Sequence, residues 1–548
     1  MNPRPVQFRS PAQILSLWQP MRGPQSVLCV LAELILLTAI SGCMVGPDYQ
    51  RPTTAMPEQF SRTEDGQKII EWWKTFQDPQ LNDLIERAAK TNLDVRAAEA
   101  RLRQARALEN VAVAGFYPSA NFSGSYTRSL GSQITSASSA SRGQRTDLYQ
   151  AGFDAAWEVD VFGGVRRQIE AADANVTAAV EDRRDVMVTL LGEIATDYIQ
   201  LRGYQERIKV AQDNTKSEAD TLHVIRQKVG AGIAPYTRLN VEQTEALVAT
   251  TEATIPPLEA SARQTIYALS ILLGEQPMAL VKELEPRHAT PMTAFPKIPL
   301  GLPSQLLERR PDVRQAEAQL HAATANIGVA TADLFPKFSL TGSIGQESNR
   351  AKNFFNTANE FWAFGPSFSW PVLDFGAIRA NIRVQDALQE QALIAYEQAV
   401  LTSLSDVENT LVGYDEEQSH LNLLHQAVVA NQAAVDTSNQ QLHAGTVDFL
   451  IVLTSEQNLF QAQDLETQSR IAISADVVSL YKALGGGWEA FEGDKSQHDV
   501  GLIFPATRPT TIGATTQAGG GTTQPGIQTN IFFTPTTEPA PPLNIVQP

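Results

Sequence analysis

The amino-acid sequence carries the same pattern twice, and this repeat limits the folds that the chain can adopt. The segment Asp94–Leu102 matches Asp312–Leu320 at seven of nine positions, at an offset of 218 residues. Later matches, at offsets of 218 and then 213 residues, are Pro118 with Pro336, Gly124 with Gly342, Trp157 with Trp370 and Gly232 with Gly445. The ordered matches predict one structural unit used twice, instead of the three or four domains that 548 residues could hold.

Both units predict a helical stretch first and a very long helix later. The first stretches, Pro79–Ala114 and Pro303–Ala332, are rich in good helix formers. The long patterns, 168–229 and 381–444, contain no proline. Each would extend about 90 Å as a helix, and patterns of this length are typical of coiled coils.

A tight turn follows each long helix, and a second helix runs back from it. The turns are expected at Gly232 and Gly445. We expect the returning helices to end near Gly274 and Gly485. Each unit thus reads as helix, pair of strands, long helix, turn and returning helix.

Between the first helix and the long helix, each unit has two segments in which apolar and polar residues alternate. The apolar positions are Phe122, Tyr126, Tyr149, Phe153, Trp157, Phe338, Leu340, Ile344, Trp362, Phe364, Phe368 and Trp370. A period of two predicts strands with one apolar and one polar face. Strands of about ten residues with aromatic ends are typical of outer-membrane proteins, which place lipid on one face and water on the other.

Four strands cannot close a barrel, whereas three chains would supply twelve. We therefore expect an α+β membrane channel, in which a trimeric twelve-stranded β-barrel continues into a periplasmic α-helical coiled-coil barrel. A soluble sandwich is the alternative for the strands alone. A lipoprotein with coiled-coil stalks is the alternative for the whole chain, but a stalk has no use for a lipid-facing band.

The N-terminus has the pattern of a bacterial lipoprotein signal. The apolar run Val27–Ile40 is too short to span a membrane, and Ser41, Gly42 and Cys43 follow it. This order predicts cleavage after residue 42 and a lipid on Cys43. An uncleaved anchor helix is the alternative, and the true start could be Met21.

Charge and motif content exclude several classes of function. The net charge is −17, which disfavours nucleic acid as a partner. Two cysteines exclude a disulfide scaffold and a cysteine-built metal cage. No phosphate-binding loop or nucleophile elbow occurs, and the seven histidines are scattered. We expect no enzymatic activity, no cofactor and no metal site.

Several motifs resemble a known family. They are Cys43–Pro52, Trp72 with Trp73, Asp78 with Pro79, Leu306–Val313, Phe335 with Pro336, and Tyr481–Trp488. On these motifs the chain resembles outer-membrane efflux lipoproteins of the NodT type, within the TolC-like outer membrane factor family. The resemblance implies a homotrimer in outer-membrane lipid, a periplasmic adaptor (membrane fusion protein) and an inner-membrane transporter of the resistance–nodulation–division (RND) class. It implies a passive exit duct for small molecules such as drugs and toxic compounds; proteins or metal ions are the alternative cargo.

The tip of the second hairpin departs from the family pattern. Thr454 stands where related channels often carry an Asp that narrows the closed tip. Asp448 and His443 are the other gate candidates at this tip. The alternatives are that Asp448 caps the next helix and that His443 faces solvent at a helix end.

The expected segments follow from these patterns. A signal peptide (1–42) precedes a lipidated segment (43–77), the two repeats are expected at 78–275 and 301–488, and a Thr/Pro/Gly-rich tail predicted to be disordered covers 489–548.

Overall fold

The structure is a computed structural model. It describes residues 44–54, 56–57, 59–61, 70–132, 134, 143–234, 236–286, 303 and 306–492. The chain divides into two units, Met1–Glu492 and Gly493–Pro548, and every element described below belongs to the first. The predicted signal peptide, Cys43 and all of the predicted tail beyond Glu492 lie outside the described residues.

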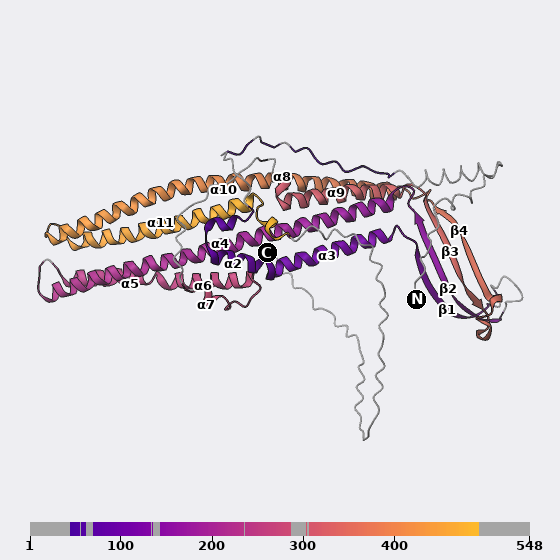
Figure 1. Cartoon of the computed structure of the whole chain (residues 1–548), viewed down its shortest axis with the longest axis horizontal. Coiled ribbons are helices and arrows are strands. Elements are labelled where there is room, and N and C mark those ends of the chain that lie inside the picture. Colours follow the sequence, from indigo (N-terminus) through magenta and orange to yellow (C-terminus); the bar gives the residue numbers. More distant parts are fainter. Residues whose placement is uncertain are drawn as a thin grey trace, which may run out of the picture. The chain divides into compact units, whose positions relative to one another are not determined.

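The two repeats contain matching elements (Figure 1). The first has η3 (Trp72–Phe76), α2 (Pro79–Thr91), α3 (Leu93–Ala114), β1 (Ser119–Leu130), β2 (Arg145–Val159), α4 (Gly164–Gly230), α5 (Arg238–Glu252), α6 (Ile255–Leu272) and α7 (Val281–Leu284). The second has α8 (Leu306–Arg309), α9 (Pro311–Ala332), β3 (Lys337–Ser348), η6 (Ala351–Asn353), η7 (Thr357–Asn359), β4 (Glu360–Ser369), α10 (Ala377–His443), α11 (Phe449–Ala483) and η8 (Trp488–Phe491). Helices α3 and α9 have 22 residues each, and α4 and α10 have 67 each. The predicted tandem repeat is confirmed.

Three helices that the sequence predicts as continuous are broken, and each break has a local cause. Residues 79–114 form α2 and α3 because the Asn92 side chain accepts hydrogen bonds from two backbone N–H groups and starts a new helix. The stretch from Pro303 is interrupted at Arg310, which precedes the proline at the first position of α9. The first returning helix divides into α5 and α6 just before Pro256 and Pro257.

The four strands form one antiparallel sheet in the order β1-β2-β3-β4. Figure 1 shows this sheet at one end of the long helices. The register aligns Phe122, Phe153, Ile344 and Trp362 in one row across all four strands. The next row contains Asn121, Asp154, Ser343 and Ala363. Because neighbouring positions point to opposite faces, the predicted apolar and polar faces are confirmed.

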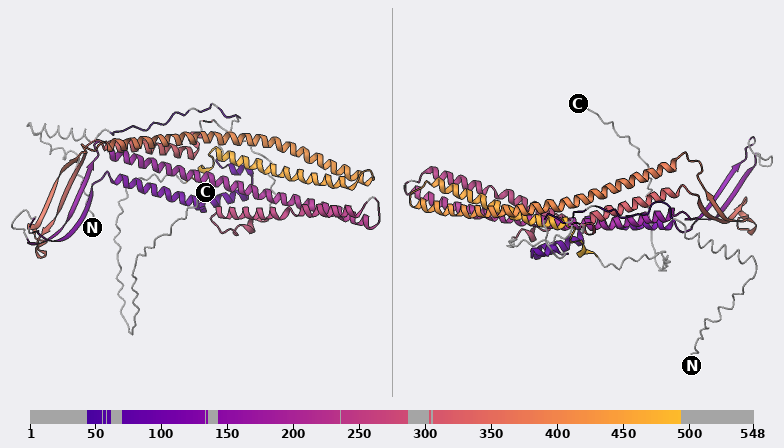
Figure 2. Two further views of the ribbon diagram at one scale, coloured as in Figure 1. Left: turned by 180° about the vertical axis from the view of Figure 1, so that it is seen from behind. Right: turned by 90° about the horizontal axis from the view of Figure 1, so that it is seen from above.

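Shorter helices follow one another along each long helix and pack against it. Helices α3, α5 and α6 pack along α4, while α9 and α11 pack along α10. Both views of Figure 2 show α10 and α11 side by side over most of the length of α11. None of the described helices is both long enough and apolar enough to cross a membrane.

In each repeat, two shorter helices meet end to end along a long helix, and this meeting point is called a joint below. A side chain donates to a helix-end carbonyl at both joints, although the donor residue differs. Asn92 donates to the carbonyl of Leu272 at 2.8 Å, where α6 meets α3. Arg310, 218 residues later, donates to the carbonyl of Ala483 at 3.1 Å, where α11 meets α9. Each joint satisfies a helix-end carbonyl that would otherwise lack a partner.

The main hydrophobic core surrounds the second joint and the middle of α4. Trp72 stacks on Tyr481 at 5.3 Å between ring centres, and Trp73 stacks on Phe491 at 5.6 Å. Both tryptophans are almost fully buried. This core fixes the middle of the helices, so the sheet and the helix tips lie on opposite sides of it (Figure 1).

Candidate functional site

The sheet has an apolar face that the chain itself does not cover. Phe364 is 77% exposed, and Trp362 and Phe368 are similarly exposed. The opposite face carries polar groups, and Ser123 contacts Asp154 there at 3.4 Å. A continuous exposed apolar face of this kind marks contact with lipid or another protein.

Residues 44–51, which follow the predicted lipidation site and are called the strap below, are held beside the end of the sheet where β2 meets α4. The backbone N–H of Val45 donates to the carbonyl of Phe162 at 3.1 Å, between β2 and α4. Arg167, only 1% exposed, donates to the carbonyl of Val45 at 3.2 Å and to Asp48 at 2.6 Å. Met44, the neighbour of Cys43, packs against Gly163 so closely that a Cβ there would lie 2.5 Å from its Cγ.

Further along the strap, side chains attach it to α9. The ring of Tyr49 stacks on His321 at 4.4 Å, and its hydroxyl contacts Glu317 at 3.3 Å. Arg51 pairs with the same Glu317 at 2.9 Å. Sequence reasoning did not single out Arg167 or these partners, because isolated charged residues in a helical pattern carry no signal of a distant contact.

The two predicted tip turns lie at the ends of two neighbouring hairpins, α4–α5 and α10–α11. Gly232 and Gly445 have φ angles of +69° and +73°, which favour glycine. The turns also share a backbone bond: Ile233 donates to the carbonyl of Lys228, and Thr446 to that of Gln441, both at 3.0 Å. These bonds end the long helices in the manner of glycine C-caps.

The three gate candidates lie near the second turn and are exposed to solvent. The Asp448 side chain accepts from the backbone N–H of Leu450 at 2.9 Å, so it caps α11. Thr454 donates to the carbonyl of Leu450, also at 2.9 Å. His443 is the last residue of α10. No contact between these three side chains occurs in the described structure, and their role as a gate stays a prediction.

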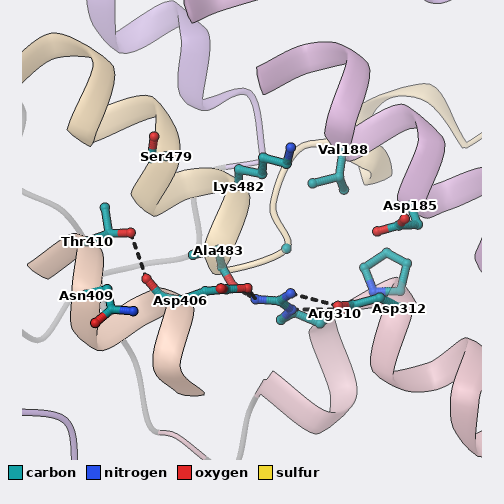
Figure 3. Close-up of a pocket in the computed structure, with 12 residues that line it drawn as sticks. Asp185, Val188, Arg310, Asp312, Asp406, Asn409, Thr410, Ser479, Lys482 and Ala483 are labelled. Atoms are coloured by element: carbon teal, nitrogen blue, oxygen red, sulfur yellow. Dashed lines mark hydrogen bonds and ion pairs between the residues drawn. The ribbon is translucent and has the colours of Figure 1, made fainter. Parts of the chain in front are cut away.

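The joint at Arg310 borders a cavity of about 370 Å³ (Figure 3). Arg310 donates to Asp312 at 2.7 Å and to Asp406 at 3.0 Å, so it connects α9 with α10 as well as with α11. Asp185 and Lys482 line the same cavity. Burial raises the pKa of Asp185. These groups come from four helices that meet around one joint, and Arg310 is part of the motif Leu306–Val313 that carried the resemblance.

Comparison with known proteins identifies the family. The model of the family "Outer membrane efflux protein" matches residues 84–275 and 302–486, which correspond to the two structural repeats. The chain belongs to the outer membrane efflux protein family. The predicted resemblance, the outer-membrane location and the efflux function are therefore confirmed.

Individual members of this family match over most of their length. The chain is 35% identical to the pyoverdine export outer membrane protein OpmQ of Pseudomonas aeruginosa, over 83% of this chain and 97% of the relative. It is 32% identical to nodulation protein T of Rhizobium leguminosarum, over 84% and 94%. Among solved structures, the outer-membrane channel OprN superposes with a TM-score of 0.75 at 36% identity, covering 82% of this chain and all of that one. These relatives are named for export, nodulation and channel formation, not for an enzymatic reaction.

Proposed function

We propose that three copies of this chain form the passive outer-membrane exit duct of a tripartite efflux pump that exports small organic molecules. The sheet would stand in the outer membrane and the helices in the periplasm. A lipid on Cys43 would anchor the strap at the membrane surface. The observation that carries the proposal is the four-stranded sheet with an uncovered apolar face and two free edges.

The free edges argue for a closed barrel shared between copies. Strands β1 and β4 each have one edge without a neighbour in the described sheet. An open sheet edge is not tolerated in the hydrocarbon region, because its backbone groups find no hydrogen-bond partners there. Two copies would close an eight-stranded barrel, whose interior is filled by side chains. Three copies give twelve strands, which leaves room for a duct.

The exposed side of α10 offers a second contact between copies. Leu401, Val412 and Leu423 are all more than half exposed and recur every 11 residues, or about three helical turns. They therefore form a stripe along one side of the helix. On the other repeat, α3 exposes Leu108 and Val111. We assign these surfaces to the contacts between neighbouring copies.

The partners and the cargo follow from the same arrangement. The helix tips lie farthest from the sheet (Figure 1), and a periplasmic adaptor would bind there. Beyond the adaptor, an RND-type inner-membrane transporter would supply the energy of export. Small organic cargo is favoured over metal ions because the seven methionines are spread through the sequence, without a cluster of soft ligands.

The oligomer is tested by native mass spectrometry of the full chain in detergent. We expect a trimer, and a stable monomer or dimer would contradict the shared twelve-stranded barrel. Val412→Glu should weaken the trimer because it places a charge in the α10 stripe. Gln432→Glu, at an exposed polar position of the same helix, is the matched control and should leave the trimer intact.

The export function is tested by accumulation of a fluorescent dye in cells that lack the gene. Restoring the full chain should lower accumulation severalfold. Equal accumulation with and without the chain, for dyes and for a panel of toxic organic compounds, would refute small-molecule efflux. A parallel panel of metal salts separates the alternative cargo, because only a metal duct would change metal tolerance.

A further inference from the structure

Two glutamates lie in the seam between the hairpins that form the helix tips. The α4–α5 and α10–α11 hairpins pack together through an apolar cluster that includes Ile225 and Leu453. Glu218 is seven residues before Ile225 on α4, and Glu456 is three residues after Leu453 on α11. Both glutamates therefore continue the helix faces that carry the cluster.

Neither carboxyl group has a cationic partner in the described part of the chain. Glu218 is 2% exposed, and its Oε1 accepts from the Thr251 hydroxyl of α5 at 3.0 Å. Glu456 is partly buried, and its Oε1 accepts from the Thr221 hydroxyl of α4 at 3.4 Å. The Oε2 atom of each glutamate is buried without a hydrogen-bond partner. An ionised carboxylate is costly in such a place.

Charged and titratable groups on the helices around the two glutamates include Lys216, Asp220 and His223 on α4, Glu252 on α5 and Asp436 on α10, all of them exposed. Farther along the same α4–α11 interface, Arg207 pairs with Asp464 at 2.7 Å, eleven residues before Glu218 and eight after Glu456. Glu218 is the charged group that acts on Glu456. Burial, and then repulsion from Glu218, raise the pKa of Glu456 to about 7, although the Thr221 hydroxyl opposes the shift. Burial also raises the pKa of Glu218.

We propose that Glu456 holds a proton beside Glu218 and so latches the α10–α11 hairpin to the α4–α5 hairpin, and that the tips loosen when the proton is lost. With the proton bound, the two glutamates together carry at most one charge. Without it, two like charges lie buried side by side, and no cation among the described residues is bonded to either carboxylate. The consequence for export, a tip that opens more easily at neutral than at acidic pH, rests on the proposed function.

The pH window follows from proton linkage. When the hairpins separate, Glu456 becomes solvated and its pKa returns to the ordinary value of 4.5. The packed state therefore binds the proton more tightly than the separated state does. The packing is most stable below about pH 4.5, weakens as the pH rises towards 7, and is level above 7 because both states are then ionised.

The first test is hydrogen–deuterium exchange of tip amides in the intact protein, with exchange rates corrected for the intrinsic effect of pH. In wild type, protection of the segments around Glu218 and Glu456 should fall about tenfold per pH unit between about pH 5 and pH 7, the slope of one proton. Glu456→Gln, which is neutral at every pH, should abolish this slope. Glu252→Gln is the matched control on the exposed side of α5 and should keep it. A flat wild-type profile, or an unchanged slope in Glu456→Gln, would overturn the latch.

A second measurement does not depend on how a variant folds. Infrared difference spectra of the wild-type protein should show a protonated carboxyl band at pH 6 that disappears by pH 8. Absence of that band at pH 6 would overturn the proposal. Because the exchange measurement reads the tips directly, its result would hold even if the cargo or the number of copies proved different from the proposed function.

Discussion

Replacing Arg167 with methionine should release the strap from the base of the sheet. Methionine keeps the aliphatic stem that packs on Gly328, but it loses the guanidinium bonds to Val45 and Gly46. These two bonds, at 3.2 and 3.4 Å, are long for a charged donor, so each contributes about 1–1.5 kcal/mol. Asp48 is 83% exposed, and its pairing adds little. The total is about 2–3 kcal/mol for local release.

The assay is exchange of the Val45 amide, which donates to the carbonyl of Phe162 only while the strap is docked. A loss of about 2–3 kcal/mol corresponds to exchange that is roughly 30–150 times faster. Arg51→Met is the matched control on the same strap, since Arg51 is half exposed and its described ion pair with Glu317 is weak. It should change exchange less than about fivefold. Equal exchange rates in wild type and Arg167→Met would refute the role assigned to Arg167.

Three further variants test other parts of the structure. Asp78→Ala removes the cap of α2 and the acceptor of the Tyr198 hydroxyl, which lies 2.6 Å away; it should destabilise the main hydrophobic core by about 1–3 kcal/mol, and an unchanged thermal unfolding midpoint would contradict this. Cys43→Ser should remove the lipid mass from the mature protein. Equal intact masses of wild type and variant, apart from the difference between cysteine and serine, would exclude the anchor. Asp448→Ala should raise the conductance of the purified protein in planar bilayers if this carboxylate gates the tip; an unchanged conductance together with a frayed start of α11 would leave capping as its only role.

The repeat and the two faces of the sheet were predictable because they depend on periodicity. Alternation in β3 and β4 places Ile344 and Trp362 on the apolar face whatever their exact partners are. The tip turns at Gly232 and Gly445 were also predictable, since few residues other than glycine adopt a positive φ after a long helix.

Contacts between distant residues of similar helices could not be predicted. Asn92 is a favourable helix cap within Pro79–Ala114, but no local pattern shows that its amide also donates to the carbonyl of Leu272 at the end of another helix. Glu218 and Glu456 both read as ordinary polar positions of long helices. Their burial arises only where the two hairpins meet, and no local pattern records that meeting.

The most direct test of the central claim is the accessibility of spin labels on β4 in the protein reconstituted into liposomes. Labels at Phe364 and Phe368 belong to the apolar face, and labels at Ala363 and Ser367 belong to the polar face. If the strands form the wall of an outer-membrane duct, the first pair will be reached by oxygen dissolved in lipid and the second pair by a water-soluble nickel chelate. Equal accessibility of all four positions to the chelate would contradict the account.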